Sequence, residues 1–402
     1  MATESTIPHP QSAIRNPQSD AEWKLVVAAG GTGGHISPAL AIADHLAKVE
    51  PACHVEFVCG TRPVEIEIYR KAGITPKTVE IERLIPGWRG LLPNLVHLRR
   101  AMKTARAYLR AEPPRVVLGM GGYVCVPVVA AASSERIATM IHEQNAVAGR
   151  ANRWLSRRVQ AIACAYPEAA RSFPSAKTRV TGNPVRSEFI GGDREAAWRR
   201  WSLSPDVPTL LVFGGSQGAR RLNEIVFDAL GILDKAVTHS RAFQVLWSCG
   251  EQNFDEIKPQ LERLALQRAV VRLVPFIREM GCAYSIADLA LCRAGAMTLA
   301  ELTANALPAI VVPLPGAVAD HQRLNAKPLA DAAAAMVIEE GALDGHHLAE
   351  RVATLLFDPA ELARMREAGR RLGRPRAVEE IAAMILKLRG GNRKGGTIKS
   401  ER

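Results

Sequence analysis

The chain has 402 residues, of which 48% are hydrophobic and 23% are charged. This composition excludes a fibrous or wholly disordered protein, and the length indicates two domains with sizeable cores. The sequence contains no run of about 18 apolar residues, the length that a transmembrane helix needs. A formal net charge of +12 favours an anionic partner, whether a nucleic acid, an acidic membrane surface or a phosphorylated substrate.

The seven cysteines and the two chain ends narrow the class of protein further. No two cysteines have C-x-x-C spacing, so the sequence predicts neither a zinc site nor a disulfide framework and suits a reducing cytoplasm. Residues 1–20 are rich in Pro, Ser, Gln and Asn without an apolar segment, which predicts a disordered tail and not a signal peptide. The basic residues 391–402 predict a second such tail.

The first strongly patterned segment is a glycine loop, Gly30–His35. The apolar run Leu25–Ala29 before it predicts a strand, and Ile36–Val49 after it has the apolar spacing of a helix. Such a loop offers backbone N–H groups to an anion at the helix start. Ile36 stands at the third glycine position of the dinucleotide fingerprint, which argues against a nicotinamide or flavin. His35 is a candidate for proton transfer.

An apolar loop and a basic helix follow. Segment 83–92 combines a tryptophan with arginines and leucines, and the predicted helix Asn94–Arg110 carries a basic stripe beside an apolar face. One interpretation is a membrane-surface patch, in which apolar side chains enter the lipid and basic ones attract its headgroups. The other is a packed loop beside a solvated helix face. The membrane interpretation involves Leu84, Ile85, Trp88, Arg89, Leu91 and Leu92.

Two further polar clusters follow predicted strands. Val116–Leu118 leads into a second glycine loop, Gly119–Tyr123, and Ala138–Ile141 leads into His142–Asn145. Polar groups directly after a parallel strand lie where α/β proteins bind ligands. The alternative for each residue is a capped helix start. After two more predicted strands, at 161–165 and 178–180, the Gly and Pro of Gly182–Arg186 predict a hinge.

The second half of the chain repeats this pattern. Thr209–Phe213 predicts a strand, Gly214–Ala219 a glycine loop and Arg220–Leu230 a helix. Further strands are predicted at 244–247, 270–274, 289–291 and 309–312, and 343–388 is expected to be mostly helical. Two halves with matching openings indicate an α/β fold of tandem doubly wound domains that face each other across a cleft.

The loop after the strand at 289–291 suits a nucleotide. Backbone amides of Arg293–Thr298 at a helix start would hold a diphosphate, and Glu301, one helical turn later, would accept both hydroxyls of a ribose. Alternatively, Glu301 only complements the helix dipole. Gln322 and Asn325 share a helix face that suits sugar hydroxyls.

Six motifs, taken together and in order, resemble one enzyme family. They are GGTGGH at 30–35 followed by SPA at 37–39, GGY at 121–123, HEQN at 142–145, GNPVR at 182–186, GGSQGAR at 214–220, and RAGA at 293–296 through Glu301. The chain resembles the MurG family of undecaprenyldiphospho-muramoylpentapeptide β-N-acetylglucosaminyltransferases, in glycosyltransferase family 28. The resemblance covers residues 24–326 and implies the GT-B fold, with two Rossmann-like domains.

The resemblance implies inverting transfer of N-acetylglucosamine (GlcNAc) from UDP-GlcNAc to the 4-hydroxyl of the muramoyl residue (MurNAc) in lipid I, the undecaprenyl-diphospho-muramoyl peptide. The product would be lipid II, for peptidoglycan synthesis. It also implies a peripheral enzyme on the cytoplasmic face of the bacterial inner membrane, with an anionic membrane surface and other cell-wall synthesis proteins as further partners. No nucleic acid, metal or cofactor is expected. Residues 21–183 with about 373–390 would form the acceptor and membrane-binding domain, and 184–372 the UDP-GlcNAc-binding domain.

The resemblance also implies roles for individual residues. Those expected at UDP-GlcNAc are Thr32, Gly33, Gly34, Asn145, Arg186, Ser216, Gln217, Ile277, Ala296, Met297, Thr298, Glu301, His321 and Gln322. Those expected at the acceptor diphosphate are Thr32, Gly33, Gly34, His35, Gly121, Gly122 and Tyr123. Cys125 and Ala294 depart from the family pattern, in which serine is common, but neither change removes a charge.

Direct displacement with inversion needs a base for the acceptor hydroxyl. His35 is the first choice, and its alternative role is to orient the acceptor diphosphate. Glu143 is the second choice, and its alternative role is to fix its own loop through backbone N–H groups. Two other functions stay open: another GT-B enzyme, such as a UDP-GlcNAc 2-epimerase, and a non-catalytic basic protein that binds nucleotides or RNA. An aromatic content of only 5% argues against RNA binding.

Overall fold

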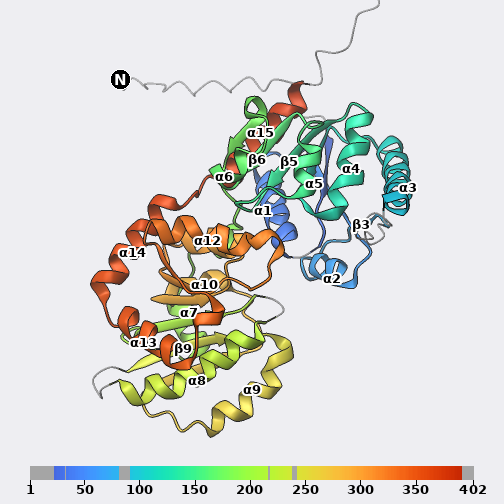
Figure 1. The fold of residues 1–402 in the computed structure, drawn as a ribbon. Coiled ribbons are helices and arrows are strands. Elements are labelled where there is room, and N and C mark those ends of the chain that lie inside the picture. The colour runs from blue at the N-terminus through green and yellow to red at the C-terminus, as the bar shows by residue number, and fades with distance from the viewer. Residues whose placement is uncertain (1–21, 32, 81–90, 216–217, 238–241, 392–402) are drawn as a thin grey trace, which may run out of the picture.

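The structure, a computed structural model, describes residues 22–31, 33–80, 91–215, 218–237 and 242–391. They form two α/β domains, each built on a parallel sheet (Figure 1). Neighbouring residues of the first strand pack into different cores, Leu25 and Val27 on one face of the sheet and Val26 and Ala28 on the other. The central strand of the second sheet alternates in the same way. Both sheets are therefore covered on both faces, and the predicted doubly wound fold is confirmed.

The N-terminal sheet has the strand order β3-β2-β1-β4-β5-β6-β7. The strands are β1 Trp23–Ala28, β2 Cys53–Cys59, β3 Lys77–Thr78, β4 Val116–Gly119, β5 Ala138–Glu143, β6 Ala161–Cys164 and β7 Thr178–Val180. The helices between them are α1 Gly33–Val49, α2 Pro63–Lys71, α3 Leu91–Ala111, α4 Gly122–Ser134, α5 Arg150–Leu155 and α6 Pro167–Ala170. The order reverses between β1 and β4, and doubly wound sheets bind ligands at such a point.

The C-terminal sheet has the strand order β10-β9-β8-β11-β12-β13, so its reversal lies between β8 and β11. The strands are β8 Thr209–Phe213, β9 Phe243–Ser248, β10 Ala269–Val274, β11 Leu289–Cys292, β12 Ala309–Val311 and β13 Ala335–Val337. The helices are α7 Arg194–Trp201, α8 Arg220–Ala236, α9 Glu251–Arg263, α10 Met280–Ile286, α11 Ala296–Ala304, α12 His321–Asp331, α13 Gly345–Leu356 and α14 Pro359–Leu372.

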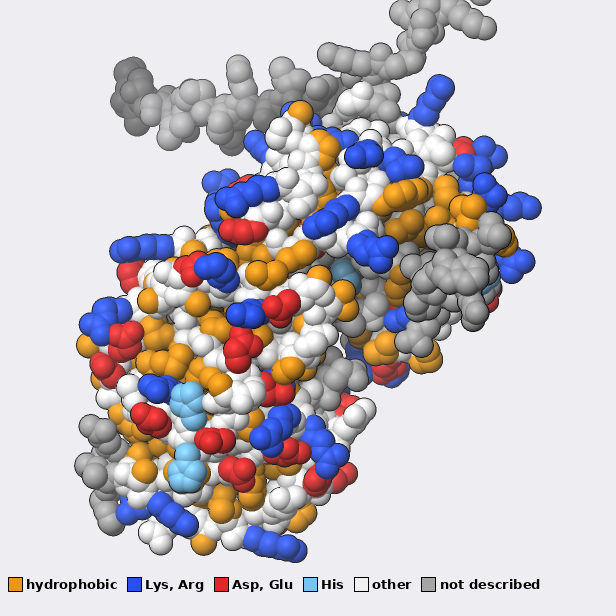
Figure 2. Space-filling model, viewed as in Figure 1, with side chains coloured by type: hydrophobic (Ala, Val, Ile, Leu, Met, Phe, Trp, Pro, Cys, Tyr) orange, Lys and Arg blue, Asp and Glu red, His pale blue; other side chains and the backbone are white. Residues whose placement is uncertain are grey.

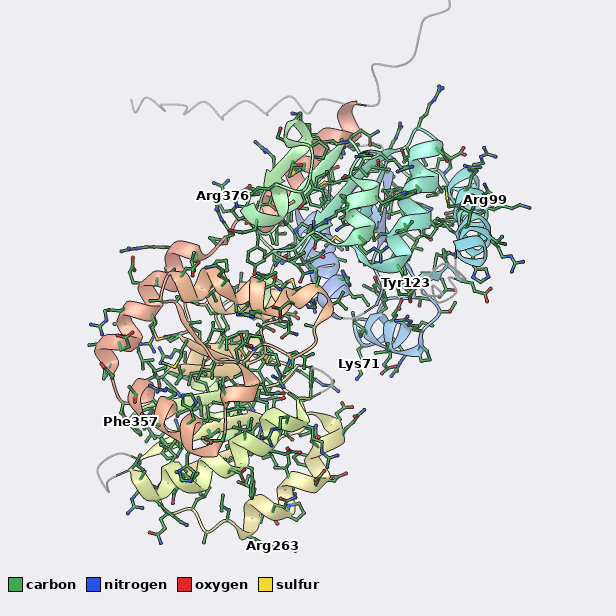
Figure 3. The ribbon with its side chains drawn as sticks, viewed as in Figure 1. Lys71, Arg99, Tyr123, Arg263, Phe357 and Arg376 are labelled. Carbon is green, nitrogen blue, oxygen red and sulfur yellow. The ribbon has the colours of Figure 1, made fainter. Side chains whose placement is uncertain are left out.

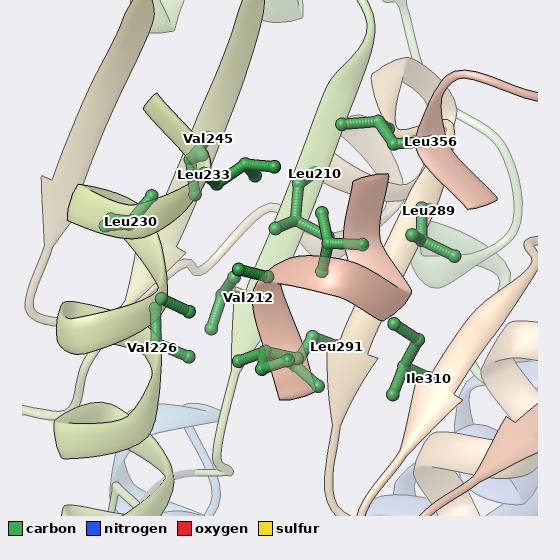
Figure 4. Packing of buried hydrophobic residues seen from close by; sticks show 14 of the residues in the cluster. Leu210, Val212, Val226, Leu230, Leu233, Val245, Leu289, Leu291, Ile310 and Leu356 are labelled. Atoms are coloured by element: carbon green, nitrogen blue, oxygen red, sulfur yellow. The ribbon is translucent and has the colours of Figure 1, made fainter. Parts of the chain in front are cut away.

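The core of the C-terminal domain shows why these segments form these elements. The apolar residues of α8 recur at helical spacing, so that Val226, Leu230 and Leu233 lie on one face. Figure 4 shows this face packed on the side chains of Val212 and Leu291 from the sheet. Burial of each such side chain stabilises the fold by about 1.5–3 kcal/mol, so the face of α8 binds the helix firmly to the sheet.

The last helix, α15 Ala377–Gly391, returns to the N-terminal domain. Figure 1 shows it in red beside the blue and green elements at the other end of the chain. Ile381 and Ile385 of α15 are fully buried in the same core as Trp23, and Arg389 forms an ion pair with Glu50 at 2.8 Å. The chain therefore crosses between the domains twice, once after β7 and once before α15.

Several predicted details differ from the structure. α1 begins at Gly33 and not at Ile36, and the expected apolar face of α3 is only partly buried, with Ala105 and Leu109 inside but Leu95 42% exposed. Two strands, β3 and β13, were not predicted. Among the described residues, no helix is long and apolar enough to cross a membrane.

Candidate active site

The imidazole of His35 lies between two glycine-rich loops, at the carboxyl ends of β1 and β4. A Cβ atom at Gly121 would lie 3.0 Å from Cδ2 of His35, and one at Gly122 would lie 3.0 Å from the carbonyl oxygen of Gly30. Gly121 and Gly122 have φ values of +94° and +75°, which side chains rarely tolerate. The His35 ring therefore occupies a place that only bare backbone leaves open.

Burial favours the neutral form of His35. Its Nδ1 atom is buried and makes no hydrogen bond to the part of the chain that the structure describes. Burial lowers the pKa of His35, and the Glu65 carboxylate and the Gly30 backbone offset part of this effect. Repulsion from His321 lowers the same pKa further. His321 belongs to α12 of the other domain, so that domain contributes to the electrostatics of this imidazole. A neutral imidazole is the form that accepts a proton.

His142, at the end of β5, is a buried structural histidine. Its Nε2 atom lies 3.1 Å from the carbonyl oxygen of Gly182, and its Nδ1 atom lies 3.0 Å from Nε2 of Gln144. Because the Gln144 amide can only donate there, Nδ1 accepts and Nε2 donates to Gly182. Burial lowers the pKa of His142 to about 4, so the ring stays neutral. It ties β5 to the segment predicted as a hinge.

Glu143 uses both carboxylate oxygens within its own loop. Oε1 accepts from the backbone N–H of Asn145 at 3.1 Å, and Oε2 accepts from the backbone N–H of Gly149 and from Nδ2 of Asn152, both at 2.9 Å. The side chain is 2% exposed. This arrangement favours the loop-fixing role over that of a base.

Asparagine side chains join the two domains beside this loop. Asn325 of α12 is fully buried, donates from Nδ2 to Oδ1 of Asn145 at 3.1 Å, and accepts from the backbone N–H of Ala146 at 2.8 Å. Asn183 donates from Nδ2 to the carbonyl oxygen of Ala296 at 3.3 Å. Asn145, expected at the donor sugar, thus lies at the domain interface, where it contacts α12, while Asn183 contacts the first residue of α11.

The start of α11 has the form of an anion site. The helix begins at Ala296 after Gly295, and no side chain caps its N-terminus, so the first N–H groups lack a side-chain acceptor. Before it, the buried Arg293 pairs with Glu340 and donates to the carbonyl oxygens of Val312 and Pro313 at 3.3 and 3.4 Å. These bonds fix the loop between β11 and α11. Met297 is 8% exposed and Thr298 is partly buried.

Glu301 lies one turn into α11 and is paired with a tyrosine. The Tyr284 hydroxyl donates to Oε2 of Glu301 at 2.6 Å, and the Tyr284 ring packs edge-on against Phe213. Burial raises the pKa of Glu301 to about 7, although the hydrogen bond from Tyr284 acts in the opposite direction. One oxygen is therefore occupied, and the charge of this carboxylate changes near neutral pH.

The other expected donor residues lie in varied surroundings. Arg186 pairs with Asp44 of α1 at 3.2 Å and with Glu188 at 2.8 Å, so its charge already bridges the domains. Ile277 is 3% exposed and belongs to the core of the C-terminal domain. Gln322 accepts from the backbone N–H of Leu314 at 2.9 Å, which leaves its amide NH₂ for a ligand.

Several predicted residues lie outside the described residues. They are Thr32, Leu84, Ile85, Trp88, Arg89, Ser216 and Gln217. Leu91 and Leu92 belong to the first turn of α3, but their side chains are not described. Gly33 and Gly34 form the first turn of α1, beside His35. Tyr123 donates its hydroxyl to Glu65.

Sequence reasoning missed Glu65 and Tyr284. Glu65 alternates with apolar residues in a short charged helix, a pattern that looks like a solvated face, yet it is fully buried. Tyr284 stands 17 positions before Glu301, and nothing in the intervening sequence indicates their contact. The Glu65 contact arises from the sheet topology, because β1 lies between β2 and β4 and brings α2 and α4 together, whereas Tyr284 and Glu301 lie on the two helices that flank β11.

Two family models match the chain. The glycosyltransferase family 28 N-terminal domain matches residues 25–164, and the C-terminal domain of the same family matches residues 209–381. A curated relative from Desulforudis audaxviator is 39% identical in an alignment 375 residues long, which covers 91% of this chain and 99% of the relative. It is named UDP-N-acetylglucosamine–N-acetylmuramyl-(pentapeptide) pyrophosphoryl-undecaprenol N-acetylglucosamine transferase.

Solved structures support the same family. The crystal structure of MurG from Acinetobacter baumannii superposes with a TM-score of 0.72 at 31% identity and covers 90% of this chain and 99% of its own. A putative UDP-N-acetylglucosamine 2-epimerase from Listeria monocytogenes gives a TM-score of 0.65 over 95% of this chain and 99% of its own, but at 14% identity it shares only the fold. The chain belongs to the MurG family of N-acetylglucosamine transferases, within glycosyltransferase family 28.

Proposed function

We propose that this protein transfers GlcNAc from UDP-GlcNAc to the 4-hydroxyl of MurNAc in lipid I and so forms lipid II. The observation that carries the proposal is the contact between α1 and α11. α1 starts at the glycine loop of His35, and α11 starts at the uncapped amides beside Glu301. The proposed base and the proposed anion site thus stand at the starts of two helices that come from different domains and contact each other, which supports transfer between two bound substrates.

The proposed reaction is a single displacement. The acceptor oxygen bonds to the anomeric carbon while the bond from that carbon to the diphosphate breaks, and UDP leaves with the bonding electrons. His35 takes the hydroxyl proton as general base. The amides and the dipole of α11 stabilise the charge on the departing diphosphate, and Glu301 accepts hydrogen bonds from the ribose. The amide NH₂ of Gln322 and the side chain of Asn145 bind the sugar.

The acceptor diphosphate is proposed to bind at the loops that hold His35. Their glycines leave backbone N–H groups accessible, and the start of α1 points its dipole towards an anion. The domain boundaries proposed for these sites are 21–183 with about 373–390 and 184–372. Burial of Ile381 and Ile385 in the core around Trp23 supports the return of the last helix to the acceptor domain.

We also propose that α3 holds the protein peripherally on the cytoplasmic face of the inner membrane. Figure 2 shows Lys and Arg side chains along the outer edge of the N-terminal domain, over α3. Arg99 and Lys103 are exposed there, next to Leu95 and Val96, which are 42% and 54% exposed. Apolar side chains beside basic ones suit a surface of anionic lipid.

The decisive experiment is transfer of labelled GlcNAc from UDP-GlcNAc to a lipid I analogue. We expect a labelled disaccharide lipid, and folded protein that yields none would overturn the proposal. The same reaction without acceptor tests the epimerase alternative, which predicts UDP-linked N-acetylmannosamine. Replacement of His35 by Ala is expected to lower kcat at least a hundredfold, the order of a general base's contribution. Turnover near that of the wild type, with an unshifted pH profile, would remove His35 from the role of base.

A further inference from the structure

A buried carboxylate underlies the glycine loop of His35. Glu65, in the first turn of α2, is fully buried, although a carboxylate is costly to bury unless it is hydrogen-bonded. The other buried side chain of α2 is Tyr69, whose hydroxyl donates to the carbonyl oxygen of Ala29 at 2.9 Å. α2 thus turns two polar side chains towards the loop that begins at Gly30, whereas a helix on a sheet usually packs with apolar side chains.

The sheet register aligns three glycines just beyond the strand ends, and two of them, Gly30 and Gly60, adjoin this carboxylate. Ala28 of β1 pairs with Val58 of β2 and with Gly119 of β4. Two positions further along each strand, at the same edge of the sheet, the residues are Gly30, Gly60 and Gly121. Oε2 of Glu65 accepts from the backbone N–H of Gly60 at 2.8 Å, and a Cβ atom at Gly30 would lie 2.6 Å from the same oxygen. The carboxylate needs bare backbone at Gly30.

The second carboxylate oxygen holds the other loop. Oε1 of Glu65 accepts a hydrogen bond from the hydroxyl of Tyr123, which is labelled in Figure 3 near the start of α4. Tyr123 directly follows Gly121 and Gly122, the glycines against which His35 packs. Glu65 therefore lies against Gly30 of the first loop and is hydrogen-bonded to Tyr123 at the end of the second loop.

The titratable groups around Glu65 and His35 differ in charge. Burial raises the pKa of Cys59 to about 12 and raises those of Tyr69 and Tyr123 above their usual range, so these groups stay neutral beside Glu65. The guanidinium of Arg62 lies 4.7 Å from the centre of the Tyr123 ring. Three titratable groups interact with His35 itself: Glu65 of α2, the neutral His142 of β5 and His321 of α12. His35 is thus a nearby group on which Glu65 can stabilise a new positive charge.

We propose that Glu65 is a positioning residue of the transfer reaction: it fixes the two loops that hold His35 and stabilises the imidazolium that forms when His35 takes the acceptor proton. The inference rests on the proposed function, with His35 as base. Glu65 itself exchanges no proton, since the hydroxyl proton stays on His35 until the product leaves. Its negative charge lies under the loop expected to bind the acceptor diphosphate, so it opposes binding of that anion while it assists the chemical step.

Because Glu65 is proposed to assist the chemical step but to oppose acceptor binding, Glu65→Gln should change kcat and KM in different ways. The amide can keep both contacts, because its oxygen can accept from Gly60 and its NH₂ can donate to the Tyr123 oxygen. We expect kcat to fall at least tenfold, KM for a lipid I analogue to stay equal or fall, and the acid limb of the kcat–pH profile to move to lower pH, because His35 loses a stabilising charge. A loop that is merely disordered would raise KM and leave the limb in place.

Two variants complete the test. Glu65→Asp keeps the charge, so its acid limb should stay at the wild-type pH even if kcat falls or if the Gln variant fails to fold. Glu67→Gln is the matched control on the same helix, because its carboxylate pairs with Arg70 on the protein surface, and it should leave kcat, KM and the limb unchanged. Wild-type kcat and an unshifted limb in Glu65→Gln would overturn the inference, as would a limb that shifts in the Asp variant. Absence of transfer by the wild-type protein would instead refute the proposed function.

Discussion

Asn325 and Asn145 form a direct hydrogen bond between the two domains, with Nδ2 of Asn325 3.1 Å from Oδ1 of Asn145. The same Asn325 side chain accepts from the backbone N–H of Ala146 at 2.8 Å and is fully buried. An amide proposed to bind the donor sugar is therefore held by the domain that carries α11. The position of Asn145 depends on how the domains meet.

Replacement of Asn325 by Ala should loosen the domain interface. It leaves the N–H of Ala146 without its acceptor, a cost of about 1–3 kcal/mol. We expect faster hydrogen exchange at Ala146 and a larger radius of gyration in solution scattering. The control is Asn223→Ala, which removes a buried amide whose bonds to the described residues lie within the C-terminal domain, to Cys249 and Trp247. Both variants should lose stability, and equal scattering from the two would contradict the assigned role of Asn325.

Glu301 should make stability depend on pH. Its folded pKa of about 7 lies above the ordinary 4.5, so its contribution to folding is fully present below pH 4.5 and is lost as the pH rises through 7. Glu301→Gln mimics the neutral form, so its stability relative to wild type should increase between pH 5 and pH 8, by about 3 kcal/mol at most. Urea unfolding at both pH values measures this. A difference that does not change with pH would contradict the prediction.

The same carboxylate should control donor affinity. Only its ionised form accepts hydrogen bonds from both ribose hydroxyls, so KM for UDP-GlcNAc should rise as the pH falls below 7. Tyr284→Phe removes a hydrogen bond that lowers the pKa of Glu301, and this rise should then begin at a higher pH. Steady-state kinetics from pH 6 to pH 9 would show the shift, and coincident curves for the two proteins would exclude it.

Substitution of Gly121 should lower kcat by more than its effect on the free energy of unfolding would explain. In Gly121→Ala the new methyl group would lie 3.0 Å from the His35 ring, and a displacement of about 1 Å can cost a hundredfold in rate. Gly73 also has positive φ, +73°, but has open space around it, so Gly73→Ala should cost only about 1 kcal/mol of stability through backbone strain. The comparison requires kcat and unfolding free energy for both. Equal loss of kcat in the two variants would show that backbone strain alone is responsible.

Charge reversal on α3 should weaken membrane binding. We expect the double variant Arg99→Glu and Lys103→Glu to sediment less with vesicles that contain anionic lipid, since each basic residue near such a surface contributes about 1 kcal/mol. Arg263→Glu on α9, in the other domain, is the matched control, and Figure 3 shows Arg99 and Arg263 far apart. Unchanged sedimentation of the double variant would rule out α3 as the contact, and transfer to a short soluble acceptor should be unaffected.

The sequence predicts the bounds of β8 and β11 well, because both strands are almost wholly apolar and end in a glycine-containing loop. β8 and β11 have every residue buried and were expected within one residue of their bounds. β3 has two exposed residues, and β13 has three residues after a run of alanines, so neither carries a periodic signal, and only pairing with β2 and β12 makes them strands.

In the candidate site, too, some features could be predicted from the sequence and others could not. Glycine loops at strand ends are local features, so the surroundings of His35 and the start of α11 could be anticipated from the sequence. The partners of those residues could not, because Glu65 reaches His35's loops through strand register and Tyr284 reaches Glu301 through the packing of α10 beside α11. The exposure of Leu95 was also hidden, since the contact of α3 with α4 buries only the half that contains Ala101, Ala105 and Leu109.

The return of α15 to the first domain has a consequence for biosynthesis. The core around Trp23 is completed by Ile381, Ala382 and Ile385, more than 350 residues later in the chain. On the ribosome, the domain that is synthesised first therefore lacks part of its core until almost the whole protein has emerged. The core of the C-terminal domain is completed slightly earlier, by Leu362 and Met365 of α14. The order in which the domains reach their final form is thus opposite to the order in which they begin.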